Sequence, residues 1–430
     1  MSKKKIEGIT KIAVSGFKSL VNECAIDICP LTILAGANSS GKSSIMQPLL
    51  MLKQTLEATY DPGPLLIEGP NVQFTEAEQF LSALAHGKGT DRFQIAIESR
   101  GFDSFFSTVT TFRKAPNRIE HVQMATSTKL GVDQLLQDIT LYPEMSPEKI
   151  GLLADQNPLL KGFNAVGRSR CFLRLESEDG HSFLIVSPPV LESHIFNTIH
   201  LPGLRGNPER TYKLTSTGPR YPGTFENYIA SIIHNWQETA DERLDRLADV
   251  LCDLGLTGQV RTEKIGDVGI DIRVGRLPHR GTGETDTVSI ADVGIGVSQV
   301  LPVLVALLVA EPGRLVYLEQ PETHLHPRAQ VTLAQLLADA AKRGVRVVAE
   351  THSSLLLLAV QTLVAEGNLS PELVKLHWFT RGENGATEIN TADLDDAGAY
   401  GDWPEDFDDV DLKAQSRYIK AAQSRLAERA

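Results

Sequence analysis

The feature that most constrains this chain is a glycine- and serine-rich loop set between an apolar strand and a helix. The strand is expected over residues 31–35 (LTILA) and the helix over about 42–56. Backbone N–H groups in such a loop, together with the positive end of the helix, attract phosphate groups. The loop fits the pattern GxxxxGK[ST], with one more serine after it, and consists of Gly36, Ala37, Asn38, Ser39, Ser40, Gly41, Lys42, Ser43 and Ser44. We therefore predict a phosphate site in which Lys42 reaches the phosphates and the Ser43 hydroxyl binds Mg²⁺.

The sequence after residue 286 alternates short apolar runs with helical patterns. Strands are expected at TVSIA, RLVYLE and VRVVAE, and helices at about 298–309, 327–341 and 353–365. Strands that alternate with helices indicate a parallel sheet. The fold class predicted is therefore α/β, with the phosphate loop at the edge of a parallel sheet.

The remaining segments indicate other kinds of structure. Residues 93–98 and 105–112 predict two strands of an antiparallel layer, because no helix separates them. Residues 127–165 are expected to be helical or irregular, and 171–186 to form a hairpin that turns at Asp179-Gly180. Spaced apolar residues over 225–254 predict a long amphipathic helix, broken at most once.

The simplest division is one discontinuous α/β domain with an α+β insertion. Residues 1–125 form the first lobe, 126–265 the insertion, which we expect to be a lid or partner-docking domain, and 266–430 the second lobe. A chain of 430 residues is long enough for this arrangement.

The charge of the chain is concentrated in one place. The formal net charge is −12, and nine acidic residues with no Lys or Arg lie within residues 393–411, so the rest of the chain carries only −3. An acidic chain is not a generic nucleic-acid coat, although a local basic groove for DNA stays open. The acidic segment is expected to be a solvated tail or a partner contact.

Four cysteines without a metal or disulfide spacing suit a reducing compartment. The longest apolar run, residues 300–310, is shorter than the roughly 20 residues that cross a bilayer. We therefore expect a cytoplasmic protein with no membrane partner.

Two further strand ends are candidates for the chemistry of a phosphate site. Glu319 ends an apolar strand, where an acid can hold Mg²⁺ opposite Ser43. Another strand runs into Glu350-Thr351-His352, and His352 can donate to a γ-phosphate or to the attacking water. Each also has a plain interpretation, as a strand end or as the start of a helix.

A second glycine-rich segment, DVGIGVSQ at residues 292–299, precedes a helix. Gly294, Gly296 and Ser298 would make a second anion site, which a single nucleotide does not need from one chain. A nucleotide held between two subunits would need it. The alternative is a glycine-rich turn with Ser298 as the N-cap.

Taken in order, these elements resemble the ABC-type ATPases of the SMC and RecF kind. FKSL at 17–20, DVGIGVSQVLP at 292–302, EQPETHLHPRAQ at 319–330 and ETHSS at 350–354 resemble, within that group, the compact bacterial ATPases related to the OLD family. These include the ATPase subunits of anti-phage systems such as Septu and Gabija. HLPGLRGNPERTY at 200–212 and GDWPEDFDD at 401–409 are also similar to segments of a subgroup within it.

The resemblance implies an ABC-type P-loop ATPase head, with a mixed sheet and an antiparallel layer, that binds ATP and Mg²⁺. Glu319 would hold Mg²⁺ with Ser43, and His352 would be the switch histidine. Ser298, Gly294 and Gly296 would cap the γ-phosphate bound to a second copy in a head-to-tail dimer or higher oligomer. Lys18 would approach the nucleotide, and Gln73 would sense Mg²⁺.

One position departs from the pattern of these ATPases. Gln320 follows the metal-binding acid, where a water-activating glutamate is usual, and an amide cannot accept a proton at neutral pH. Hydrolysis is then slow, or another acid serves as the base. Of Glu322 and Glu350, Glu350 is preferred, because strand ends in open α/β sheets line the ligand crevice.

Two metal interpretations stay open as minor alternatives: zinc at His324 and His326, and a nuclease metal pair among residues 406–411. The function predicted is an ATPase that dimerises around ATP and controls an effector, such as a nuclease on another chain, in bacterial anti-phage defence. The alternatives are an ATP-holding sensor or scaffold, a DNA repair ATPase, and a DNA-directed nuclease.

Overall fold

The computed structural model describes residues 7–401 and Arg417, apart from residues 84–88, 102, 117, 131–133, 180–181, 186–188 and 278–285. Its centre is a six-stranded sheet in which the first five strands are parallel and the last is antiparallel. The order of strands is β11 (Ile199–Leu201), β16 (Leu315–Glu319), β17 (Arg346–Thr351), β3 (Leu31–Gly36), β18 (Val374–Arg381) and β19 (Thr387–Ala392).

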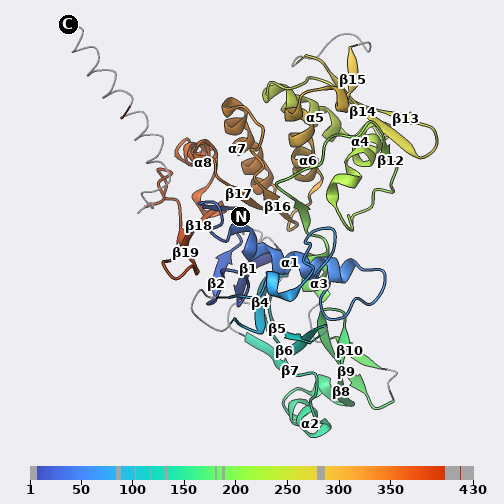
Figure 1. Ribbon diagram of the computed structural model, residues 1–430, viewed down its shortest axis with the longest axis vertical. Helices are drawn as coiled ribbons and strands as arrows, with labels where there is room; N and C mark the ends of the chain where they lie inside the picture. Colours follow the sequence, from blue (N-terminus) through green and yellow to red (C-terminus); the bar gives the residue numbers. More distant parts are fainter. Residues whose placement is uncertain are drawn as a thin grey trace.

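A second six-stranded sheet is antiparallel throughout and lies on one side of the central sheet (Figure 1). Its order is β2 (Cys24–Asp27), β1 (Gly8–Ser15), β4 (Arg92–Arg100), β5 (Ser104–Ala115), β6 (Arg118–Leu130) and β7 (Gln134–Leu141). The antiparallel layer predicted from residues 93–112 is thus confirmed.

Two smaller sheets lie toward opposite ends of the molecule (Figure 1). One contains β10 (Phe183–Ile185), β9 (Phe172–Ser177) and β8 (Phe163–Ser169). The other contains β12 (Tyr212–Lys213), β14 (Gly269–Gly275) and β13 (Val260–Ile265), with β15 (Thr287–Ser289) paired to β14. The hairpin expected over 171–186 is the antiparallel pair β9–β10.

Helices cover both faces of the central sheet. The α-helices of the described residues are α1 (Lys42–Glu57), α2 (Pro147–Gln156), α3 (Pro189–Phe196), α4 (Ile229–Glu238), α5 (Glu242–Asp253), α6 (Ile295–Val309), α7 (Pro327–Lys342) and α8 (Ser354–Ala365), of which α2 packs on β8 and not on the central sheet. The helices predicted after residues 42, 298, 327 and 353 are confirmed as α1, α6, α7 and α8.

The alternation of side chains along the strands decides which layer packs on which face. Leu31, Ile33 and Ala35 of β3 point into a core formed with α4 to α8. Leu34 of β3 and Tyr317 of β16 point the other way, into a core shared with α1 and the antiparallel sheet. Because both faces are buried, the strands read as continuous apolar runs, which is why the sequence reveals them.

The expectation for residues 127–165 was wrong for much of its length. The segment contains the end of β6, all of β7 and the start of β8, and α2 is its one α-helix among the described residues. The sequence around Thr126 and Thr128 supplies β-branched residues in alternation, which suits a strand that is buried on one face.

The amphipathic stretch 225–254 forms two helices. α4 ends at Glu238, and Asp241 begins α5 by accepting a hydrogen bond from the Arg243 N–H. Helices of 10 and 12 residues span about 15 and 18 Å, so no long arm exists here. Their apolar faces pack against α6, as Trp236 and Leu251 illustrate.

Residues 126–265 share the sheets of the rest of the chain. Strand β6 runs across residue 126, and β11 forms an edge of the central sheet beside β16. The division into two lobes around an inserted domain stays a hypothesis.

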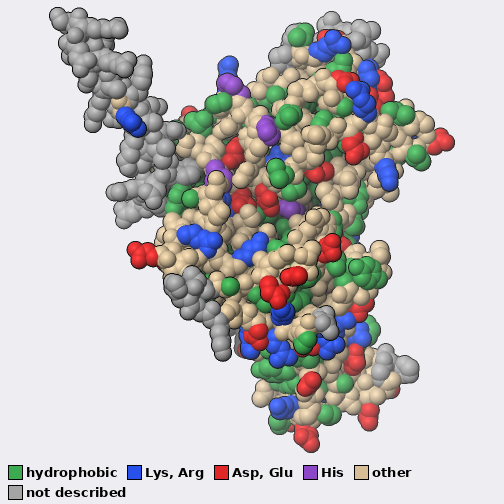
Figure 2. Space-filling model, viewed as in Figure 1, with side chains coloured by type: hydrophobic (Ala, Val, Ile, Leu, Met, Phe, Trp, Pro, Cys, Tyr) green, Lys and Arg blue, Asp and Glu red, His purple; other side chains and the backbone are tan. Residues whose placement is uncertain are grey.

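Basic and acidic side chains are interspersed over the face of the molecule in Figure 2, so the residues coloured there form no single-sign surface in that view. In the described part of the chain, no helix is both long and apolar enough to span a bilayer.

Candidate functional site

The loop predicted to bind phosphate connects the carboxyl end of β3 to the first turn of α1. Gly36 and Gly41 have φ angles of 140° and 108°, which side-chain-bearing residues rarely adopt. A Cβ on Gly36 would lie 2.2 Å from the carbonyl oxygen of Phe379 on β18. Gly36 is therefore required both by the backbone turn and by the close approach of β18, and Gly41 by its backbone angle and by the Thr387 side chain, whose Oγ1 would lie 2.4 Å from an added Cβ.

Lys42 folds back over this loop. Its Nζ donates hydrogen bonds to the carbonyl oxygens of Gly36 at 3.0 Å and Ala37 at 2.8 Å. Burial lowers the pKa of Lys42, while the charges of Glu350 and Glu322 oppose the shift. The cation is thus held at the mouth of the loop, where phosphate oxygens can replace the two carbonyls as acceptors.

A cavity of about 740 Å³ opens beside the loop. It brings together most of the predicted loop residues with Gln320, Glu350 and His352. The loop follows β3, Gln320 follows β16, and Glu350 and His352 lie at the end of β17. The lining residues are Lys18, Ser19, Val21, Asn38, Ser39, Ser40, Gly41, Lys42, Ser43, Ser44, Gln47, Gln79, Leu81, Ala83, Gln320, Glu350, His352, Arg381, Asn384 and Gly385. Glu319, Gly294, Gly296 and Ser298 do not line it.

Glu350 is the carboxylate in direct contact with the loop. The Ser43 hydroxyl donates to Glu350 Oε1, and the Tyr317 hydroxyl donates to Glu350 Oε2, each at 2.7 Å. The side chain is 3% exposed, and this burial, with the charge of Glu319, raises the pKa of Glu350 to about 7. A hydroxyl and a carboxylate side by side are the hard oxygen donors that Mg²⁺ prefers, so these residues fit such an ion.

Glu319 lies one strand further from the loop. Its Oε2 accepts a hydrogen bond from the Gly203 N–H at 3.1 Å, and its Oε1 lies 3.2 Å from His200 Nε2. Burial acts to raise the pKa of Glu319, but the contacts with His200 and Gly203 outweigh it, and the pKa lies below its usual value. Glu319, the acid predicted to face Ser43, is therefore held ionised. It lies beside Tyr317, whose ring stacks on His200.

The segment after Glu319 turns sharply into the cavity. Gln320 has a φ of 44° and donates its backbone N–H to the carbonyl of Glu350. Glu322 accepts from the Thr351 hydroxyl and the His352 N–H through Oε1, while its buried Oε2 has no hydrogen-bond partner. Burial and the charge of Lys42 lower the pKa of His352. The predicted switch histidine is thus biased toward its neutral form beside the loop.

The second glycine-rich segment, residues 292–299, forms the start of α6. Gly294, not Ser298, is the N-cap, so the helix begins three residues earlier than expected. The Ser298 hydroxyl donates to the Ile295 carbonyl, and nothing lies within 4 Å of a Cβ built on Gly294. Ile295 is half exposed, so the segment faces outward rather than into the cavity of its own chain.

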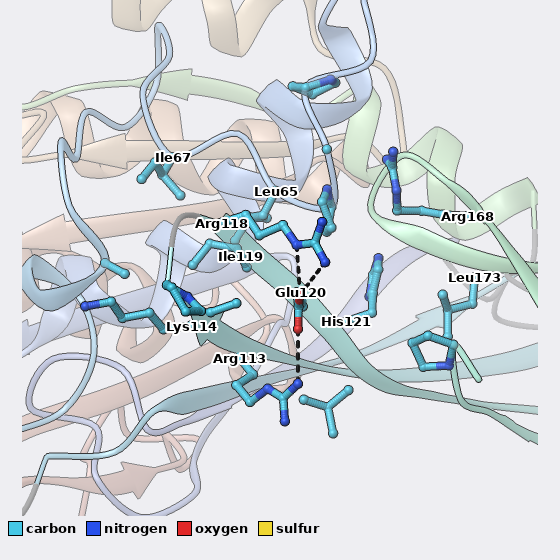
Figure 3. A pocket seen from close by; sticks show the side chains of 18 of the residues that line it. Leu65, Ile67, Arg113, Lys114, Arg118, Ile119, Glu120, His121, Arg168 and Leu173 are labelled. Carbon is cyan, nitrogen blue, oxygen red and sulfur yellow. Dashed lines mark hydrogen bonds and ion pairs between the residues drawn. The ribbon is translucent and has the colours of Figure 1, made fainter. Parts of the chain in front are cut away.

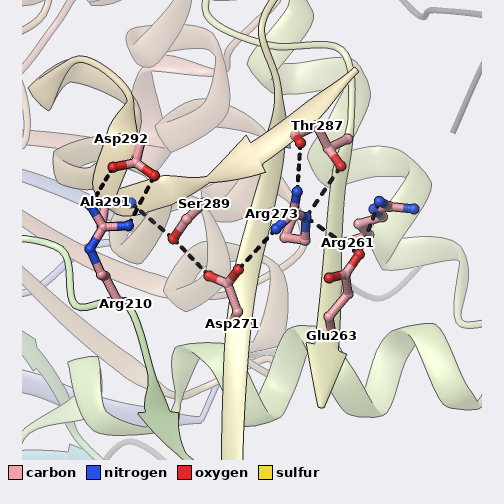
Figure 4. Close-up of polar contacts among 9 residues, drawn as sticks. All are labelled: Arg210, Arg261, Glu263, Asp271, Arg273, Thr287, Ser289, Ala291 and Asp292. Atoms are coloured by element: carbon pink, nitrogen blue, oxygen red, sulfur yellow. Dashed lines mark hydrogen bonds and ion pairs between the residues drawn. The ribbon is translucent and has the colours of Figure 1, made fainter. Parts of the chain in front are cut away.

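A polar network fixes the approach to this segment (Figure 4). Ser289 and Arg273 both contact the buried carboxylate of Asp271, and Arg273 also donates to the Thr287 carbonyl. Arg210 forms a two-pronged ion pair with Asp292, at 2.6 and 3.1 Å. The residues before the first glycine are therefore anchored to β14 and to the chain before β12.

Several residues at the site were not predicted. Tyr317 and His200 contact the two carboxylates, and Arg381 lines the cavity and donates to the Ser39 carbonyl. Lys18 lines the cavity as expected and donates to Gln47, whereas Gln73 is exposed and outside the lining. The sequence signal that pointed to His200 was the segment HLPGLR at residues 200–205, which is similar to segments of the related ATPases named above.

The zinc alternative finds no support among the described residues. They contain no group of three or more His, Cys, Asp or Glu side chains arranged to hold a metal ion. His326 is instead the N-cap of α7, where its Nδ1 accepts from the Arg328 N–H. The acidic pairs at 406–411 lie outside the described residues.

A larger cavity of about 1090 Å³ lies where β5 and β6 meet the chain after α1 (Figure 3). Its charges balance, because four cations (Arg113, Lys114, Arg118 and Arg168) and four acids (Glu76, Glu78, Glu120 and Glu144) line it. Arg113 and Arg118 share Glu120, and Lys114 pairs with Glu78. His121 lines it, and burial lowers the pKa of His121 to about 4. With its charges balanced, this cavity does not favour an anionic ligand.

Comparisons with known proteins agree with this geometry. Residues 8–137 match the family model "AAA ATPase domain", and residues 187–359 match "AAA domain, putative AbiEii toxin, Type IV TA system". No curated protein matches the chain.

One solved structure supports the fold. The chain is similar to the crystal structure of an SmcHead bound to the C-winged helix domain of ScpA, with 14% identity and a TM-score of 0.50, over 91% of this chain and 99% of that one. An Smc head domain with an extended coiled coil, bound to the C-terminal domain of ScpA derived from Pyrococcus furiosus, has 13% identity and a TM-score of 0.47, over 97% and 100%. The predicted fold class, an ABC-type P-loop ATPase head, is confirmed.

Proposed function

We propose that this chain, an ATPase of the AAA and SMC-head type, binds Mg²⁺–ATP in the loop cavity and that two copies associate head to tail around two nucleotides. The observation that carries the proposal is the separation of the two anion-binding elements within one chain. Gly294, Gly296 and Ser298 do not line the loop cavity, and the space around Gly294 is open. A second copy can supply them to complete each site.

In the proposed site the chain's own groups have distinct tasks. Lys42 exchanges the carbonyls of Gly36 and Ala37 for phosphate oxygens. Ser43 and Glu319 stay the proposed metal residues, and Glu350, whose carboxylate touches Ser43, stays the proposed base. Bound Mg²⁺ would neutralise part of the phosphate charge.

Water activation is assigned to two neighbouring groups. The Gln320 amide orients the attacking water, and the Glu350 carboxylate accepts its proton, since a pKa of about 7 suits a general base near neutral pH. His352, neutral because its pKa is lowered, donates one hydrogen bond toward the phosphates.

A mixing experiment tests the shared site. Lys42→Ala removes the loop cation, and Gly294→Asp places a carboxylate where the partner's γ-phosphate would lie. Asp is a favoured N-cap and the position is open, so Gly294→Asp is expected to fold. Each variant alone should hydrolyse no ATP. A mixture should regain up to about half of wild-type turnover, since neither variant associates with itself and each mixed dimer has one intact site of its two.

The control for Lys42→Ala is Lys264→Ala, which removes an exposed lysine from β13 and should retain wild-type turnover. An equimolar mixture that stays inactive, while wild-type protein hydrolyses ATP, would show that the two elements do not meet across subunits.

An ATP-holding sensor is the second candidate, because Gln320 lines the cavity at the position where the related ATPases carry a glutamate. The same turnover assay separates the two. Fewer than about one ATP hydrolysed per dimer lifetime would favour the sensor.

We extend the proposal to the control of an effector, such as a nuclease on another chain, in bacterial anti-phage defence. Two findings support it: the resemblance of the sequence motifs to defence ATPases, and a family model whose description includes a putative AbiEii toxin of a toxin–antitoxin system. Co-purification of the full-length protein with the product of a neighbouring gene tests this extension.

A further inference from the structure

Residues 200–213 lie between the nucleotide cavity and the segment that carries the second set of glycines. We call residues 200–213 the coupling segment and residues 292–299 the signature segment. The coupling segment starts in β11, which pairs with β16, and ends in β12, which pairs with β14. It is therefore attached at one end to the strand that carries Glu319 and at the other to the sheet that precedes the signature segment.

Arg205 is the centre of this connection. The side chain is buried, and its guanidinium donates to four backbone carbonyls: Pro202 at 3.2 Å, Gln299 at 2.7 Å, Glu319 at 3.0 Å and Gln320 at 3.0 Å. Gln299 returns two contacts, since its side-chain amide donates to the carbonyls of Arg205 and Gly206. One cation thus joins the end of β16 to the end of the signature segment.

The other end of the signature segment is held by the same stretch of chain. Arg210 is five residues after Arg205, and its guanidinium forms a two-pronged ion pair with Asp292, the first residue of the signature segment (Figure 4). Both ends of the signature segment are therefore bound by arginines of the coupling segment.

The chemistry of Arg205 makes this connection stiff. Its donors form a planar fork of fixed geometry, and a buried guanidinium that loses its acceptors leaves an uncompensated charge in the interior. A shift of Gln320 toward a nucleotide must therefore carry Arg205 with it, and Gln299 follows. Its four hydrogen bonds reach the coupling segment itself, the signature segment and the end of β16. Motion of the signature segment independent of the end of β16 is therefore unfavourable.

We propose that the coupling segment transmits the state of the nucleotide cavity to the signature segment of the same chain, with Arg205 as the positioning residue. The proposal rests on the function proposed above, because the signature segment matters through the nucleotide of a second copy. It gives residues 200–213 a role in deciding when a subunit is competent to associate.

The first test compares two buried arginines. Arg205→Lys keeps the positive charge but loses the fork. Arg346→Lys is the matched control, since Arg346 is also buried and donates to carbonyls, those of Glu7 and Ile28, away from the cavity. Both variants are expected to lower the melting temperature. We expect Arg205→Lys to bind a fluorescent ATP analogue within about threefold of wild type but to need at least tenfold more protein for ATP-dependent association, while Arg346→Lys associates as wild type.

The second test uses the exposed pair, which does not endanger folding. Arg210→Asp and Asp292→Arg should each weaken ATP-dependent association at least fivefold, measured by analytical ultracentrifugation. The double variant, which swaps the two charges, should restore at least half of the lost association. Arg92→Ala, which removes an equally exposed partner of Asp91, is the control and should change nothing.

Hydrogen exchange separates failure of this inference from failure of the proposed function. In the Gly294→Asp background, which does not associate, ATP should slow exchange both in the loop at 36–44 and around the signature segment. Adding Arg205→Lys should abolish the slowed exchange around the signature segment and retain the slowed exchange in the loop. An equal loss of association in Arg205→Lys and Arg346→Lys, a charge swap without rescue, or unchanged exchange at the signature segment would each overturn the coupling.

Discussion

Replacing Glu350 with glutamine is expected to stabilise the nucleotide-free protein above neutral pH while abolishing ATP turnover. Glu350 is 3% exposed, and burial with the charge of Glu319 raises its pKa from the usual 4.5 to about 7. Between these two values the folded chain binds a proton that the unfolded chain has released. Stability therefore falls as the pH rises through this window, and the loss is complete above pH 7.

The size of the effect follows from the shift. About 2.5 pKa units correspond to about 3 kcal/mol, the free energy that the ionised Glu350 removes from folding at pH 8. Glutamine avoids this loss, and its amide oxygen still accepts from the Ser43 hydroxyl. With an unfolding entropy of about 0.9 kcal/mol/K for a chain of this length, Glu350→Gln should melt about 3 °C higher at pH 8 and at the same temperature as wild type near pH 4.5.

Thermal unfolding followed by circular dichroism at a series of pH values measures this difference. Glu366→Gln is the control, because Glu366 is exposed at the end of α8 and its replacement should give no pH-dependent difference. A Glu350→Gln difference that is constant across the pH range, or that has the opposite sign at pH 8, would refute the argument from burial.

Two further predictions concern the neighbourhood of the site and the acidic segment. Tyr317→Phe removes the hydroxyl that donates to Glu350 Oε2, so we expect the free energy of unfolding to fall by about 1–3 kcal/mol. The pKa of Glu350 should rise further, which would shift the pH–turnover profile to higher pH. An unshifted profile would contradict this prediction. Deletion of residues 392–411 should leave ATP affinity unchanged in isothermal titration calorimetry, and a weaker affinity would place the acidic segment at the nucleotide site.

The sequence predicted the loop, the parallel strands β3, β16 and β17 and the helices after residue 286 because local constraints specify them. The prediction for TVSIA was wrong, because this run forms β15, which pairs antiparallel with β14 outside the parallel sheet. Gly36 and Gly41 adopt backbone angles that few other residues tolerate, and a buried parallel strand must be apolar along its length. The same local reasoning failed at residues 127–165, where antiparallel strands contain many polar residues among the apolar ones.

The contacts of the site depend on which strand lies beside which. Strand β17 lies between β3 and β16 in the central sheet, so Glu350 rather than Glu319 meets Ser43. Nothing in the spacing of these residues along the chain encodes that order, because it results from packing elements far apart in the sequence.

The sequence by itself predicted a phosphate site at residues 36–44 and determined the α/β fold around it, since that loop needs particular residues at fixed spacing. Only the tertiary structure decided which groups each carboxylate contacts: Glu350 contacts the loop, and Glu319 contacts His200 and Gly203. It also brought Arg205, about 94 and 114 residues from two of its acceptors, into the bonds that join β16 to α6. The physical reason is that a hydrogen bond is specified by position in space, and only folding sets the distances between residues remote along the chain.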